Sequence, residues 1–235
     1  MRLLIPVLLV LLSGCSAPRS PELPDRSDFL SAWDSAQYPG ALTALERGLI
    51  EARDLQMTYK VSSQGAFTAS ISGRLDLRAD ADTLVTGVGT FGGQPVDLLI
   101  VARGDSLFGG NGGNRFAISR PAELRDAMVI GLTRMGILHN LARLTTGAPP
   151  DHGEGGVRKW VLPMDVTRSE AAQQPSAPEG DSIHTFRFDI QVSGTRSGSA
   201  ALTFRRASGL PRMRLQEVAF QDGMMLVREE YSWQR

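Results

Sequence analysis

A period of two in the hydrophobic pattern dominates the sequence after residue 55. In residues 67–79, FTASISGRLDLRA, the apolar residues Phe67, Ala69, Ile71 and Leu75 alternate with polar ones. This alternation is typical of a strand with one buried face and one solvated face. Short breaks join most of the segments of this kind, which predicts that they pair as antiparallel neighbours. The remaining strands are predicted over residues 56–63, 83–91, 95–102, 157–166, 182–194, 199–208, 210–220 and 224–233.

Two segments follow a helical period instead. Residues 41–54, ALTALERGLIEARD, place four apolar residues at helical spacing, with Glu46 expected on the polar side and Tyr38-Pro39-Gly40 as a break before the helix. Residues 121–147 carry apolar residues around most of the helix circumference, so this helix must be buried nearly all round. The predicted architecture is α+β, with one curved antiparallel sheet wrapped around two helices.

Length and charge set limits on the class of protein. The chain has 235 residues, of which 42% are hydrophobic, and its formal net charge is zero. This composition suits one globular domain with a sizeable core. The arginines are dispersed among acidic residues and no basic run exists, so nothing in the sequence points to a nucleic-acid partner.

The first sixteen residues have the features of an export signal. Arg2 precedes an apolar stretch over residues 3–12 that is too short to span a bilayer. The stretch ends in Leu12-Ser13-Gly14-Cys15, which resembles a bacterial lipobox. The resemblance implies cleavage before Cys15, acylation of that cysteine, and, with Ser16 next, sorting to the outer membrane with the domain facing the periplasm.

This N-terminal pattern gives a division of the chain. Residues 1–14 are expected to form the signal peptide, residues 15–27 the lipidated cysteine and a flexible Pro- and Ser-rich tether, and residues 28–235 the folded domain. Cys15 is the only cysteine, so no disulfide can form within the chain. The alternative is an ordinary secretory signal with an incidental cysteine.

One short motif raises the question of catalysis. Gly104-Asp105-Ser106-Leu107 matches the signature of a class of lipases, in which the serine is the nucleophile. Those enzymes place the serine in a parallel α/β sheet, whereas here the motif lies between two apolar runs with turn chemistry, so Ser106 is expected to be a hairpin residue. His139, His152 and His184 lack the spacing of a zinc site, and we expect no enzyme activity and no cofactor.

The order of elements resembles the LolA/LolB-like lipoprotein-carrier superfamily over residues 40 to 235. The resemblance lies in that order and in phrases such as ISGRLDLRADADTLVTGVGTF and GLPRMRLQEVAFQDGMMLVREEYSW. It implies a half-open β-barrel whose helices cover an apolar cavity, and a carrier or acceptor that binds a lipid or an acylated ligand without chemistry. The family's usual Arg-Pro pair in an early turn is replaced here by RADADTLVTG.

The expected cavity lining consists of large apolar residues on the inward faces of the strands and on the second helix. Flexible methionines among them suit an irregular guest. Two alternatives stay open: the same residues fill the solid core of an envelope lipoprotein that acts as a protein-interaction module, or Ser106 serves an esterase. The predicted lining residues are Phe67, Ile71, Leu75, Leu98, Ile100, Met128, Met135, Leu138, Phe186, Phe188 and Met225.

Overall fold

The computed structural model describes residues 38–78, 82–138, 158–159, 161–170, 182–220 and 223–234. Cys15, the tether, His139 and His152 lie outside these residues. The helical elements are α2 (Tyr38–Glu51), α3 (Leu124–Ile130) and η1 (Gly131–Met135). The strands are β1 (Asp54–Gly65), β2 (Ala69–Arg78), β3 (Thr83–Phe91), β4 (Gln94–Arg103), β5 (Ser106–Asn111), β6 (Asn114–Ser119), β7 (Val161–Glu170), β8 (Ile183–Val192), β9 (Thr195–Arg205), β10 (Pro211–Phe220) and β11 (Gly223–Trp233).

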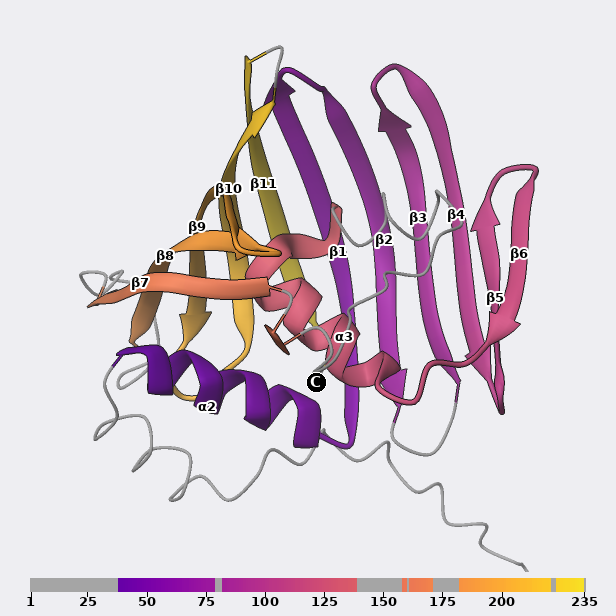
Figure 1. Ribbon diagram of the computed structural model, residues 1–235. Coiled ribbons are helices and arrows are strands. Elements are labelled where there is room, and N and C mark those ends of the chain that lie inside the picture. Colours follow the sequence, from indigo (N-terminus) through magenta and orange to yellow (C-terminus); the bar gives the residue numbers. More distant parts are fainter. Residues whose placement is uncertain are drawn as a thin grey trace, which may run out of the picture.

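All eleven strands form one antiparallel sheet in the order β6-β5-β4-β3-β2-β1-β11-β10-β9-β8-β7. Strands that follow one another in the sequence are neighbours in space, except for β6 and β7, which lie at opposite edges of the sheet. The two halves join where β1 pairs with β11, with Tyr59 opposite Tyr231. The sheet curves around α2, α3 and η1 without closing (Figure 1). The predicted fold class, an α+β half-open barrel around helices, is confirmed.

The first helix begins earlier than predicted. Tyr38-Pro39-Gly40 form the first turn of α2 rather than a break before it. Proline fits a first helical turn because the N–H that it lacks would have no partner within the helix there. Leu42, Leu45 and Leu49 are buried, as the helical spacing indicated.

The second helical segment is not one regular helix. It consists of α3 and then the π-helical turn η1, which ends at Gly136, whose φ of 82° is unfavourable for other residues. A Cβ atom at this position would lie 2.6 Å from Oε1 of Glu229, so only glycine fits. Residues 136–138 are again α-helical. Residues 139–147 of the predicted helix lie outside the described residues.

Two strand predictions need correction. Residues 106–119, for which the sequence predicted no strand, form the hairpin of β5 and β6, which turns at Gly112-Gly113. Strand β7 starts at Val161 instead of residue 157, since Arg158-Lys159 are helical, and it continues to Glu170 into the expected polar loop. A β-bulge between Met164 and Thr167 allows this length, because it absorbs the extra residues locally.

Candidate functional site

The predicted cavity residues lie together on the inner side of the half-barrel, with one exception. Ten of the eleven are less than 9% exposed and belong to one continuous apolar cluster, which also includes the buried leucines of α2. The ten are Ile71, Leu75, Leu98, Ile100, Met128, Met135, Leu138, Phe186, Phe188 and Met225. Period-two alternation therefore located the inward face correctly in β2, β4, β8 and β11.

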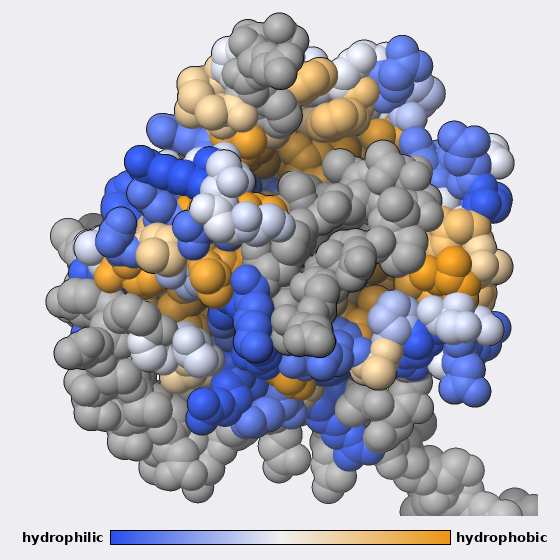
Figure 2. Space-filling view, viewed as in Figure 1, coloured by the Kyte–Doolittle hydropathy of each residue, from blue (hydrophilic) through white to orange (hydrophobic). Residues whose placement is uncertain are grey.

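Phe67 is the exception. It precedes β2, its side chain is 38% exposed, and its ring stacks on Phe91 with the ring centroids 6.0 Å apart. Phe91 lies at the end of β3, opposite Ala69, and Val96 follows on β4. These partly exposed apolar residues form a rim, and Figure 2 shows hydrophobic side chains gathered at that end of β1 to β4.

A tyrosine lies across the inner face below this rim. The hydroxyl of Tyr59 donates a hydrogen bond to the carbonyl oxygen of Thr86 at 2.6 Å. Its ring fits because Gly73 and Gly87 lack side chains, since a Cβ atom at Gly73 would lie 2.4 Å from the Tyr59 hydroxyl oxygen. Burial raises the pKa of Tyr59, with a further contribution from the charge of Glu229, so the phenol stays neutral at physiological pH.

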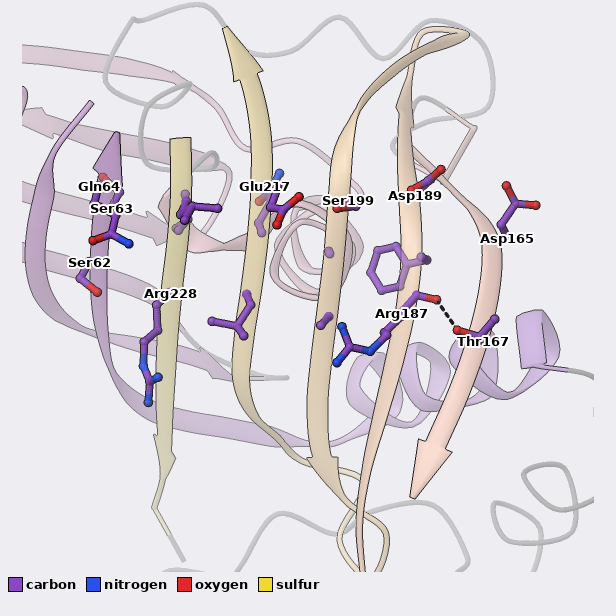
Figure 3. A pocket seen from close by; sticks show the side chains of 17 residues that line it. Ser62, Ser63, Gln64, Asp165, Thr167, Arg187, Asp189, Ser199, Glu217 and Arg228 are labelled. Carbon is purple, nitrogen blue, oxygen red and sulfur yellow. Dashed lines mark hydrogen bonds between the residues drawn. The ribbon is translucent and has the colours of Figure 1, made fainter. Parts of the chain in front are cut away.

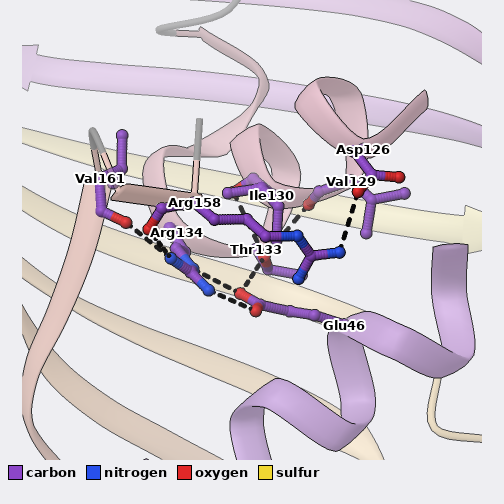
Figure 4. A network of polar contacts seen from close by, with 8 residues as sticks. All are labelled: Glu46, Asp126, Val129, Ile130, Thr133, Arg134, Arg158 and Val161. Atoms are coloured by element: carbon purple, nitrogen blue, oxygen red, sulfur yellow. Dashed lines mark hydrogen bonds and ion pairs between the residues drawn. The ribbon is translucent and has the colours of Figure 1, made fainter. Parts of the chain in front are cut away.

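A buried ion pair holds the helical segment in place (Figure 4). Nη2 and Nε of Arg134 donate to Oε2 and Oε1 of Glu46 at 2.6 and 2.7 Å. Thr133 Oγ1 also donates to Glu46, at 3.0 Å, and Nη1 of Arg134 reaches the carbonyl oxygen of Val161 at 2.6 Å. Glu46 is fully buried. These contacts connect η1 to α2 and to β7.

A second set of buried polar groups connects the same segment to β10 and β11. The Glu229 carboxylate accepts hydrogen bonds from the N–H groups of Ile137 and Leu138 at 2.8 and 2.9 Å, and from the Tyr231 hydroxyl. The Arg214 guanidinium donates to the carbonyl oxygen of Arg134 at 2.6 Å. Burial raises the pKa of Tyr231 and lowers that of Arg214.

Sequence reasoning missed both polar clusters. Glu46 was expected on the polar side of its helix, yet it follows Leu42 by four residues and therefore lies above it on the apolar face. Glu229 likewise shares the alternation of Met225 and Val227 on β11. Both glutamates occupy positions that the periodicity assigns to the buried apolar face. A charged residue at such a position predicts a buried group that is paired with another polar group, and this was the signal in the sequence.

The structure places Ser106 in a hairpin, as predicted. Gly104-Asp105 form the turn, and Ser106 begins β5 opposite Arg103. Seven strands, from β4 to β9 through β1, separate β5 from β8, which carries His184. The Nε2 atom of His184 lies 2.8 Å from the Ser182 hydroxyl oxygen. The serine and histidine of the lipase pattern are therefore not brought together.

Neither a metal cluster nor a spanning helix occurs in the described part of the chain. Within it, three His, Cys, Asp or Glu residues nowhere gather closely enough to hold an ion. The helices described there are too short or too polar to cross a membrane.

A groove of about 760 Å³ lies on the opposite, outer face of the sheet. Outward side chains of six strands, β1 and β7 to β11, line it, and Figure 3 shows them in front of the strands with the helices behind. Leu215 and Leu226 contribute apolar surface, being 41% and 42% exposed. From the alternation of polar and apolar residues, this face was expected only to be the solvated side of the sheet.

Comparison with known proteins gives similarities of fold only. The chain is similar to LprF from Mycobacterium bovis, with 11% identity, a TM-score of 0.41, and coverage of 92% of this chain and 95% of that one. A LolA superfamily protein from Nitrosomonas europaea is 9% identical, with a TM-score of 0.33 and coverage of 84% and 92%. A beta-barrel-like protein of unknown function from Brucella abortus is 10% identical, with a TM-score of 0.34 and coverage of 76% and 95%. No family model and no curated protein matches the chain.

Proposed function

We propose that this protein is an envelope lipoprotein, anchored by acyl chains at Cys15, that binds an acyl chain of a lipid or of an acylated ligand on the inner side of the half-barrel. The ligand lies between the inner faces of β2 to β4 and the segment formed by α3 and η1. Binding and release involve no covalent step, and other envelope proteins are the donors or acceptors of the ligand.

One observation carries the proposal: within the described residues, the hydrogen bonds between the helical segment and the sheet reach only one half of the sheet, whereas apolar side chains face inward on both halves. These hydrogen bonds reach β7, β10 and β11, through Val161, Arg214 and Glu229. On β2 and β4, the inner face presents Ile71, Leu75, Leu98 and Ile100 to the same apolar cluster. Because apolar contacts are non-directional, an acyl chain can replace the contacts of these side chains at little cost in free energy. The hydrogen bonds to β7, β10 and β11 meanwhile keep the helical segment in place.

The rim supports a path to this site. Phe67, Phe91 and Val96 lie at the end of β1 to β4 where the strands turn, and they are partly exposed. An entering acyl chain would exchange membrane contacts for these side chains before it reaches Ile71. Phe67, predicted as a lining residue, thus belongs in this proposal to the entrance.

The anchor is tested by metabolic labelling. Cells that make the protein are expected to incorporate radioactive palmitate into it, and Cys15→Ala is expected to abolish the label and release the protein from the membrane fraction. An unlabelled wild-type chain with a free cysteine at residue 15 would contradict the anchor. It would leave the inner site to be judged separately, by ligand binding to the folded domain.

The inner site is tested by filling it. Native mass spectrometry of wild-type protein, purified gently from membranes, is expected to show bound lipid. In Ile100→Trp the indole takes the space of the acyl chain, so we expect at least a tenfold loss of bound lipid with little change in Tm. Leu99→Trp is the matched control, because the neighbouring side chain faces outward and is 37% exposed.

The competing solid core predicts a different result. A well-packed core that receives a larger side chain loses about 1–3 kcal/mol of stability. Wild-type protein without lipid, together with an Ile100→Trp variant destabilised by that amount, would overturn the proposed carrier function and favour an interaction module.

A further inference from the structure

The outer groove has a regular arrangement of charges that the carrier function does not use. Antiparallel register places outward side chains in two rows that cross β11, β10, β9 and β8. The first row is Arg228, Leu215, Ala201 and Arg187, and the second is Leu226, Glu217, Ser199 and Asp189. The rows are two residues apart along each strand, or about 7 Å.

The middle of the groove is hollow because β9 presents small side chains there. Ser199 and Ala201 lie between the longer side chains of β8 and β10 in the two rows. Beside them, Leu215 and Leu226 are 41% and 42% exposed. The floor of the groove therefore consists of small and partly apolar side chains. Arginines of the first row lie along one side of it and acidic residues of the second row along the other (Figure 3).

Part of this charge is already neutralised and part is not. Asp189 accepts a hydrogen bond from Arg196 at 2.9 Å, and Arg228 pairs with Glu230 at 2.7 Å. Within the described ranges, the side chains of Arg187 and Glu217 form no hydrogen bond or ion pair, and both are exposed. One cationic flank and one anionic flank thus remain available to an external partner.

We infer that the outer groove binds an amphipathic helix of a partner protein. The helix crosses β8 to β11 with an apolar stripe on Leu215 and Leu226, acidic residues beside Arg187, and basic residues beside Glu217. Three strand spacings separate Arg187 from Arg228, about 14 Å, which corresponds to two and a half helical turns. Apolar anchors with flanking charges are the recognised features of a helix-in-groove interface.

Shape and charge decide between the partners. A second copy of this chain offers complementary charge rows, but its hollow would face another hollow and leave the floor uncovered. An anionic lipid surface would match the arginines and be repelled by Glu217 and Asp189. A helix with one acidic and one basic flank fills the hollow over β9 and places opposite charges beside both rows.

The experiment places a photo-crosslinking benzoylphenylalanine at Leu215 in the full-length protein, in the cells that make it. Sequencing of the crosslinked product is expected to give a segment of another protein with apolar residues at helical spacing, acidic residues on one flank and basic residues on the other. Arg187→Glu is expected to lower the crosslink yield about tenfold. Reversing the facing acidic residue of the partner to lysine restores it.

The matched control is Arg115→Glu, an exposed arginine on β6 at the far end of the sheet, which leaves the yield unchanged. Crosslinks to lipid alone, to a second copy of this chain, to a segment without the charged flanks, or to nothing would each overturn the inference. Lipid bound to the Arg187→Glu variant, measured by native mass spectrometry, stays at the wild-type level, so failure here is distinguishable from failure of the carrier function.

Discussion

Replacing Arg134 by leucine is expected to lower the free energy of unfolding by about 3–5 kcal/mol, because it leaves the Glu46 carboxylate buried without its cationic partner. Glu46 is fully buried, and Arg134 supplies two of its hydrogen bonds. Urea denaturation followed by circular dichroism measures the change. An unchanged m-value shows that the variant exposes the same amount of surface on unfolding as the wild-type protein.

Two further variants separate the ion pair from simple loss of a side chain. Arg103→Leu removes the ion pair between Arg103 and Asp82, in which the two side chains are 71% and 40% exposed. This variant is expected to lower the free energy of unfolding by less than about 1 kcal/mol. The double variant Glu46→Leu/Arg134→Leu removes both buried charges and is expected to recover most of the lost stability. A single Arg134→Leu variant as stable as Arg103→Leu would contradict the anchoring role of the pair.

Glu229→Leu is expected to destabilise the protein by about 3 kcal/mol or more, since several buried donors lose their acceptor at once. These are the N–H groups of Ile137 and Leu138 and the hydroxyl of Tyr231. Hydrogen–deuterium exchange is expected to show that the Ile137 and Leu138 amides exchange faster in the variant than in wild type, whereas amides in the middle of the sheet change less.

The neighbouring residue is the matched control for this variant. Glu230 lies on the outer face and pairs with Arg228 through side chains about half exposed, so Glu230→Leu is expected to change stability by less than about 1 kcal/mol. If the Ile137 and Leu138 amides exchange equally slowly in Glu229→Leu and in wild type, Glu229 does not hold this part of the chain.

The parts of the fold that follow from alternation were predictable. The inward positions of β2 and β8 were identified because apolar residues recur there at every second position. In one hairpin that the pattern missed, glycine is the reason. In β5, Gly109-Gly110 occupy strand positions without a side chain, so a real hairpin with β6 lacked the hydrophobic signal.

The candidate site was predictable only in part. Alternation identifies which residues face inward, but it does not indicate whether they surround a guest or pack on one another, since both need the same residue types. The break in the helix at Gly136 lies against Glu229, which is 93 residues further along the chain and leaves no room for a side chain at residue 136. Local propensity carries no information about such a contact.

The open edges of the half-barrel have a consequence for the association of one molecule with another. A sheet that does not close ends in β6 and β7, and a terminal strand can recruit a strand of another molecule. Here β6 is only six residues long, and β7 contains Pro163, which lacks an N–H donor, and a bulge with Asp165 at a φ of 51°. Both edges therefore disfavour the addition of a further strand, which lets the barrel stay open without pairing edge to edge.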